Sequence, residues 1–185
     1  MDIRRADETL AYHAARLLLL IRFCGKPRTG SPGALTGIEG RTLLAKLDFF
    51  LRYPAYLKRA AEILKKDLSN EDLGLIQDDE VHSVESRMVR YLYGPWDHVY
   101  YPALAYLIGK ELVTTEVRGG TEVFRLTPMG WDVAGQLAQE PAYGDLARRA
   151  DTAYRLFRQY KGSGLKGFIY DYFPEVVNRG LGAMI

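Results

Sequence analysis

Apolar positions recur at helical spacing in several segments of the chain, and clusters of glycine and proline separate these segments. The spacing predicts a helix over Thr9–Phe23, and Gly25 stands where a C-terminal glycine is expected. A second helix is predicted over Gly40–Phe50, and Pro54 interrupts or restarts it. Thr36–Glu39 has the spacing of a capping box, so we expect it to belong to the start of this helix.

The pattern changes to strand-like alternation in the middle of the chain. Met88–Tyr93 reads as an extended segment that ends at Gly94-Pro95. Two further strands are predicted over Leu112–Arg118 and Thr121–Leu126. Between them, Gly119-Gly120 can adopt the positive φ angles of a two-residue hairpin, so these strands form an antiparallel pair.

Helices are predicted on both sides of this hairpin. One covers Tyr100–Gly109, and another begins at Thr127-Pro128, where threonine caps the helix and proline fits its first turn. Ala142–Tyr160 forms a further helix, and a glycine-rich break at 162–164 separates it from the short aromatic segment Leu165–Phe173. The predicted fold is mainly α with a small β-hairpin: a winged helix-turn-helix with additional N- and C-terminal helices.

The chain of 185 residues has enough apolar residues, 48%, for a folded core. We expect an N-terminal helical part over 1–85, a winged-helix core over 86–140 and a C-terminal helical extension over 141–185, together forming one compact unit. The apolar run at Leu17–Ile21 is too short to span a bilayer, and no signal-peptide cleavage site follows it, so we expect a cytoplasmic protein.

Charge is nearly balanced overall, with a net value of +2, but it is unevenly placed. Residues 41–66 carry seven basic and two acidic side chains, and residues 148–166 carry six and one. Residues 67–85 carry seven acidic and no basic side chains. These segments are either solvated helix faces or two basic surfaces and one acidic surface for different partners.

Few residues point to catalysis. The three histidines, His13, His82 and His98, are not at metal-ligand spacing, and Cys24 is the only cysteine. The chain has no phosphate-binding glycine loop and no Gly-x-Ser-x-Gly elbow. We therefore expect a non-enzyme without cofactor or metal; an enzyme would require the histidines to converge through folding.

Aromatic residues are abundant and concentrate around a Tyr-Gly-Pro-Trp turn: Tyr91, Tyr93, Trp96, Tyr100 and Tyr101. Such rings either fill a core or anchor an interface with protein or nucleic acid.

The helix over Tyr100–Gly109 would enter the major groove if this fold read DNA. It carries no Arg, Asn or Gln for bidentate base contacts, which favours an adaptor or a binder of DNA without regard to sequence. The candidate backbone-contacting residues are Lys110, Arg118, Arg125, Arg148 and Arg155.

The Gly40–Phe50 helix and the Tyr93–Trp96 turn together resemble the middle components of bacterial three-component ABC ATPase conflict systems, including the accessory subunit of Lamassu-type antiphage defence. The same turn beside an early Lys-Leu-x-Phe-Phe-type helix is also similar to SocA-like (Panacea) antitoxins.

The Lamassu resemblance implies a non-catalytic subunit that docks on an SMC/Rad50-like ATPase and its effector, often a nuclease, with ATP bound by the partner. The positions that it marks for folding or docking are the turn Tyr93, Gly94, Pro95 and Trp96 and the helix faces around Lys46 and Phe50. To the docking residues we add Tyr100 and Tyr101 from the aromatic cluster. The alternative is a winged-helix transcriptional regulator or antitoxin-like protein.

Overall fold

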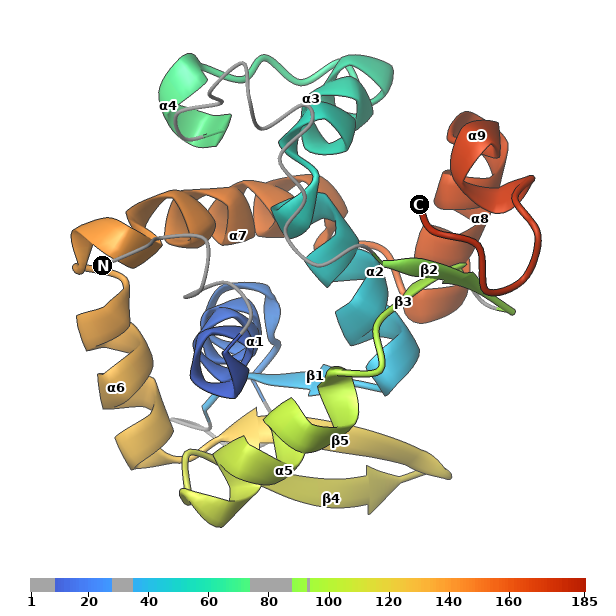
Figure 1. Ribbon diagram of the computed structural model, residues 1–185. Helices are drawn as coiled ribbons and strands as arrows, with labels where there is room; N and C mark the ends of the chain where they lie inside the picture. The colour runs from blue at the N-terminus through green and yellow to red at the C-terminus, as the bar shows by residue number, and fades with distance from the viewer. Residues whose placement is uncertain (1–8, 28–34, 74–87, 93) are drawn as a thin grey trace.

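The computed structural model describes residues 9–27, 35–73, 88–92 and 94–185. Most of the described residues are helical, and two small antiparallel sheets complete the fold (Figure 1). The helices are α1 (Leu10–Cys24), α2 (Arg41–Arg52), α3 (Pro54–Ile63), α4 (Asn70–Leu73), α5 (Tyr100–Gly109), α6 (Pro128–Leu137), α7 (Gly144–Phe157), α8 (Gly162–Tyr172) and α9 (Pro174–Val177), with a 3-10 turn, η3, at Pro141–Tyr143. The strands are β1 (Gly37–Glu39), β2 (Val89–Tyr91), β3 (Gly94–Trp96), β4 (Val113–Arg118) and β5 (Thr121–Leu126).

Helix α1 lies at the centre of the molecule. In Figure 1 it is seen nearly end-on, with α7 above it, α6 and α2 on its two sides, and the three-stranded sheet with α5 below. Its residues are therefore buried almost all the way round, including Arg16 and His13. One hydrophobic cluster runs from Ala14 to Val177 and includes residues from each of the three predicted segments.

The larger sheet has the strand order β1-β5-β4. The predicted hairpin is confirmed: β4 and β5 pair from Val113↔Leu126 to Arg118↔Thr121, and Gly119 and Gly120 have φ angles of 53° and 80°. The capping-box prediction is wrong, because Gly37–Glu39 is strand β1 and pairs with β5. The Thr36 hydroxyl donates a hydrogen bond to the Ile21 carbonyl oxygen, which links this segment to the end of α1.

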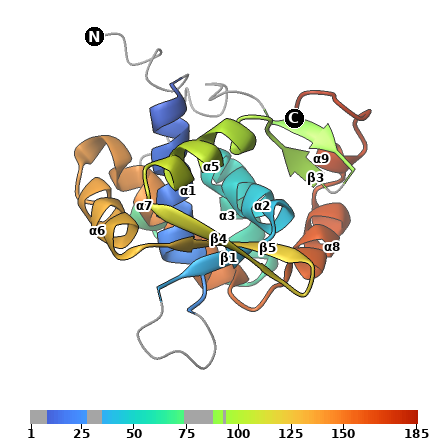
Figure 2. The same cartoon turned by 90° about the horizontal axis from the view of Figure 1, so that it is seen from below.

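The smaller sheet pairs β2 with β3. We expected Gly94-Pro95 to end an extended segment; instead Gly94–Trp96 is a strand that returns along Val89–Tyr91. The C-terminal residues bond to the same ribbon. The Arg90 N–H donates to the Ala183 carbonyl, and the Ile185 N–H donates to the Met88 carbonyl. This sheet lies beside α2, away from β4 and β5 in Figure 1, and Figure 2 shows the same separation from below.

Helix α2 is enclosed on more than one side. Three charged residues of the segment 41–66, Lys46, Asp48 and Arg52, are buried and so belong to neither a solvated helix face nor an exposed basic surface. The helix contacts α1, α3, α7 and α8 as well as β1 and β3, so its polar face is covered too.

Two of the charged segments contact each other within the chain. On α7, Arg155 forms an ion pair with Asp72 of α4, and Arg149 donates to the Leu73 carbonyl. Part of the acidic segment is thus neutralised within the chain; its remainder at 74–87 lies outside the described residues.

Candidate functional site

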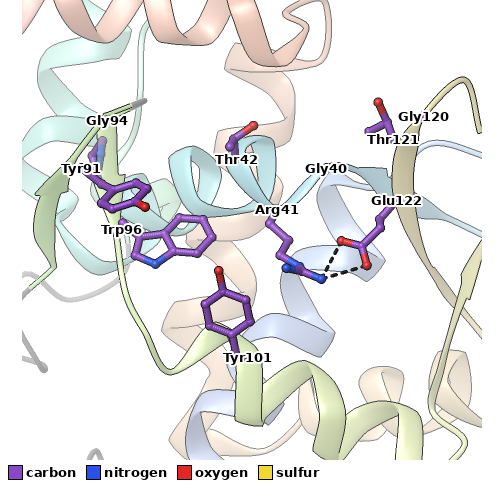
Figure 3. A pocket seen from close by; sticks show the side chains of 11 residues that line it. Gly40, Arg41, Thr42, Tyr91, Gly94, Trp96, Tyr101, Gly120, Thr121 and Glu122 are labelled. Carbon is purple, nitrogen blue, oxygen red and sulfur yellow. Dashed lines mark hydrogen bonds and ion pairs between the residues drawn. The ribbon is translucent and has the colours of Figure 1, made fainter. Parts of the chain in front are cut away.

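A concave site of about 350 Å³ opens where four parts of the fold meet. The β2–β3 ribbon, the start of α2, the start of α5 and the tip of the β4–β5 hairpin form its walls (Figure 3). Its lining residues are Gly40, Arg41, Thr42, Tyr91, Gly94, Pro95, Trp96, Tyr101, Gly120, Thr121 and Glu122. We call this site the aromatic groove.

Three aromatic rings form one side of the aromatic groove. The Trp96 ring centroid lies 5.8 Å from that of Tyr91 and 5.9 Å from that of Tyr101. Tyr91 and Tyr101 are 44% and 51% exposed, whereas Trp96 is only 7% exposed and forms the floor. Edge-to-face packing against Tyr100 fixes the Trp96 ring from beneath, with centroids 5.2 Å apart.

The opposite side of the aromatic groove carries a paired charge. Arg41 Nη2 lies 2.8 Å from Oε1 and 2.7 Å from Oε2 of Glu122, as the dashed lines in Figure 3 mark. The same guanidinium lies over the Tyr101 ring, 5.0 Å from its centroid. The site therefore presents large apolar rings beside an ion pair that is already neutralised.

The predicted partner-binding residues fall into different environments. Trp96 and Tyr101 line the aromatic groove, and Tyr93 lies outside the described residues. Phe50 and Tyr100 are completely buried, which corrects the expectation that they contact a partner. Phe50 packs against Phe157 at 4.4 Å between centroids, so its role is in the core.

Lys46 is also buried, so the prediction that it contacts a partner is wrong as well. Its Nζ donates to the Thr42 carbonyl one turn earlier in α2, at 3.0 Å. Burial, together with the nearby charge of Lys166, lowers the pKa of Lys46 to about 8.

A cluster of buried charged residues joins α1, α2 and the start of α5. Asp48 accepts two bonds from Arg16, at 2.7 and 3.2 Å, and one from the Tyr100 hydroxyl, at 2.8 Å. Arg52 donates to Asp97 at 2.8 Å and lies 3.7 Å from Asp48. Two arginines thus face two aspartates, and this balance of charge allows the group to be buried.

His13 completes this buried cluster. Its Nδ1 lies 2.9 Å from Arg16 Nη1, which can only donate, so His13 accepts and its imidazole is neutral. Burial lowers the pKa of His13 and the charge of Arg16 lowers it further; Arg52 acts in the same direction, while Asp97 and Asp48 oppose it. Burial disfavours ionised Asp48, but Arg16 and Arg52 outweigh it and the pKa of Asp48 lies below its ordinary value.

The depressed pKa of His13 predicts a pH-dependent stability. Its unfolded pKa is near 6.5, so the unfolded chain binds the proton more readily than the folded chain does. The contribution of neutral His13 to the free energy of unfolding should be complete above about pH 6.5. It should be lost progressively as the pH is lowered towards the pKa of His13 in the folded chain. Urea denaturation between pH 8 and 5 measures this slope, and His13→Gln, which retains an acceptor, should flatten it. An unchanged slope in that variant would contradict the assignment.

The predicted nucleic-acid-binding residues do not form one surface. Arg118 lies at the hairpin tip and Lys110 follows α5, whereas Arg148 and Arg155 belong to α7 on the far side of α1 (Figure 1). Arg148 is paired with Asp145, and Arg155 with Asp72.

Arg125 does not present its charge to DNA as the sequence suggests, because both of its Nη atoms are bonded within the chain and its side chain is only 15% exposed. It donates to the Leu35 carbonyl at 2.6 Å and to Glu116 at 3.3 Å, and so holds the segment before β1 against the sheet.

Two residues of the aromatic groove were missed as site residues. In the sequence, Arg41 is one charge among several in the basic segment 41–66, and Tyr91 is one of several aromatic residues near the Tyr-Gly-Pro-Trp turn. The signal that could have found them is weak: Gly40 precedes Arg41, and Tyr91 lies directly before the Tyr-Gly-Pro-Trp turn.

The described residues contain no group of three His, Cys, Asp or Glu side chains placed to hold a metal ion. Within the same residues, no helix has the length and apolar character needed to cross a membrane.

Comparisons with known proteins add no independent assignment. No family model, no curated protein sequence and no solved structure matches the chain. The function is therefore argued from the geometry of the site.

Proposed function

We propose that this protein is a non-catalytic accessory subunit that docks on a larger protein through its aromatic groove. The single observation that carries this proposal is the exposure of Tyr91 and Tyr101 around the buried floor of Trp96. Tyr, Trp and Arg are the residue types that anchor protein interfaces, and concave, well-supported positions are where such anchors concentrate.

The order of elements supports a winged-helix scaffold. The succession α1, β1, α2, α5, β4, β5 with sheet order β1-β5-β4 places a hairpin wing next to a short strand and a helix. Between α2 and α5 the chain inserts α3, α4 and the β2–β3 ribbon. This insertion contributes Tyr91 and Trp96, so the aromatic groove exists only because the scaffold is elaborated there.

The outward face of α5 favours protein over DNA bases. Its exposed large side chains are Tyr101, Tyr106 and Ile108, and α5 contains no Arg, Asn or Gln. Helices that read the major groove depend on bidentate donors and acceptors, which this face lacks. The neutralised Arg41–Glu122 pair also makes the groove a poor electrostatic site for phosphate.

The partner we propose is the one implied by the sequence resemblance: an SMC/Rad50-like ABC ATPase with its effector, in an antiphage defence complex. In this arrangement the partner binds ATP and the present chain couples it to the effector. Backbone contact with DNA through Lys110 and Arg118 is compatible with this role, because Lys110 directly follows α5 and Arg118 is the last residue of the wing strand β4.

The test is co-purification from cells that express the native operon with this chain tagged. The wild type should retain the ATPase, identified by mass spectrometry, and Tyr91→Ala with Tyr101→Ala should lower its recovery roughly tenfold or more. Tyr172→Ala is the matched control, since Tyr172 is 45% exposed but lies on α8, outside the groove, and should leave recovery unchanged.

Two outcomes would contradict the docking proposal. The first is equal recovery of the ATPase by the groove variant and the wild type. The second is sequence-specific operator binding that persists near physiological salt, which would favour a winged-helix regulator instead. DNA binding that collapses as salt is added would indicate backbone contact alone and would leave the docking role in place.

A further inference from the structure

Strand β4 has one edge that is not paired within the described chain. It ends the strand order β1-β5-β4, and in Figure 1 it forms the lower border of the sheet. Its sequence, Val-Thr-Thr-Glu-Val-Arg, is rich in β-branched residues, and such an edge can accept another strand.

The hydrogen-bond register identifies which backbone groups of β4 point outward. Glu122 O accepts from Gly40, and Leu126 N–H donates to Thr36, so the even-numbered residues of β5 face β1. The odd-numbered residues of β5 therefore face β4, where their partners are Thr114, Glu116 and Arg118. Since bonding alternates along an antiparallel pair, the N–H and C=O groups of Val113, Thr115 and Val117 point away from the sheet.

A shallow groove lies at the end of the sheet where β4 begins. It encloses about 770 Å³ and is lined by Ile108, Glu111, Val113, Thr114, Thr115, Thr127, Pro128 and Met129. Ile108 and Met129 are exposed apolar side chains within it. At the other end of β4, Val117 is 72% exposed, the highest value of any large hydrophobic residue described.

We propose that β4 pairs with β4 of a second copy of this chain, antiparallel about a two-fold axis through Thr115. In this register Thr115 faces Thr115 of the second copy, Val113 faces Val117, and Thr114 faces Glu116. Every outward-pointing residue then meets another outward-pointing residue, so the main-chain groups can exchange hydrogen bonds. The interface is isologous and closes on itself.

Shape and charge both favour a second copy as the occupant. The protruding Val117 of each copy is brought opposite Val113 of the other, at the groove beside Ile108. No like charges face each other directly, and a Thr–Thr pair at the axis is favourable. A register shifted so that Thr115 faces Val117 would place the two Glu116 carboxylates opposite each other, which disfavours it.

Cross-linking through an introduced cysteine tests this register. The native Cys24 is buried, so Thr115→Cys adds a single accessible thiol. In the proposed dimer the Cα atoms of residue 115 in the two copies would lie about 5.5 Å apart, which is within the range that a disulfide spans. Under mild oxidation we expect Thr115→Cys to form a covalent dimer at least about tenfold faster than Thr114→Cys, the neighbouring control whose counterpart is not opposite.

Analytical ultracentrifugation of the untagged full chain tests association itself. Dimer, at twice the monomer mass of 21.0 kDa, should appear as the concentration rises towards about 1 mM. Thr115→Pro should remain monomeric, because it removes an outward N–H without breaking a bond to β5. Its folding is checked by circular dichroism, and Val117→Asp, which places a charge at the paired edge, provides a second variant.

Three results would overturn the proposal: a wild type that is monomeric at the highest concentration, a dimer that persists in folded Thr115→Pro or Val117→Asp, or equal cross-linking rates for Thr115→Cys and Thr114→Cys. A strand supplied by a different protein would give the first of these. The proposal does not depend on the aromatic groove, so the two can fail separately.

Discussion

Replacing Asp48 with alanine should lower the free energy of unfolding by about 3–5 kcal/mol, the cost of breaking a buried ion pair from one side. Asp48 is completely buried and accepts bonds from Arg16 and Tyr100. Its removal takes away the carboxylate that Arg16 contacts at 2.7 Å, while the contact of Arg52 with Asp97 at 2.8 Å remains. Because natural domains are stable by about 5–15 kcal/mol, this variant should be close to unfolding at 37 °C.

Urea denaturation measures the effect, and two further variants separate its causes. Asp132→Ala removes an exposed carboxylate of α6 and should change stability by less than about 0.5 kcal/mol. Combining Arg16→Met, Asp48→Leu and Tyr100→Phe removes the charge, the counter-charge and the hydroxyl together. Since well-packed apolar replacements of a buried pair are often neutral, this triple variant should recover most of the lost stability.

A loss of less than about 1 kcal/mol in Asp48→Ala would contradict this account, because it would mean that water or another group compensates Arg16. The result also bears on function. The same cluster holds Tyr100, which supports the floor of the aromatic groove through Trp96. Docking should therefore weaken in Asp48→Ala only in step with unfolding, whereas Tyr91→Ala with Tyr101→Ala should weaken docking in a folded protein.

The local elements of this fold were predictable where their signals lie within a few residues. Thr9 caps α1, Gly119-Gly120 turns the hairpin, and Thr127 caps α6, each by a contact to a near neighbour in sequence. Thr36–Glu39 was mispredicted because its outcome was decided by β5, about 85 residues away. Here the pairing with a distant strand outweighs the local preference for a helix cap.

The candidate site was predictable only in part, for a related reason. Trp96 and Tyr101 have a sequence signal, because they lie in the conspicuous aromatic turn, and both line the groove that the structure outlines. Phe50 and Tyr100 belong to the same aromatic population, and only the packing of α2, α5 and α7 decides that they are buried. Asp48 and Arg52 appear in sequence as solvent-facing charges, since a helix that is covered on several sides leaves no local signature for its buried ion pairs.

Gly130→Ala should lower the free energy of unfolding by about 3 kcal/mol, near the upper end of the usual cost of overpacking. A Cβ at this position would lie 1.9 Å from the carbonyl oxygen of Leu112 and 2.8 Å from its carbon. These are backbone atoms at the start of β4, and the same carbonyl accepts from the Thr127 N–H at 3.1 Å. The first turn of α6 and the entry to β4 would have to separate, which breaks that bond.

Gly167→Ala is the matched control for this clash. It is the same substitution inside a helix, α8, but a Cβ there meets nothing within 4 Å. The gain in helix propensity should therefore stabilise the protein by up to about 1 kcal/mol. Thermal and urea denaturation measure the change in the free energy of unfolding for both variants. The two changes should have opposite signs if the close approach of the Leu112 backbone is the reason that position 130 requires glycine. Equal and favourable effects would show instead that α6 can move away from β4 at little cost, and that the hairpin is not held in place by this contact.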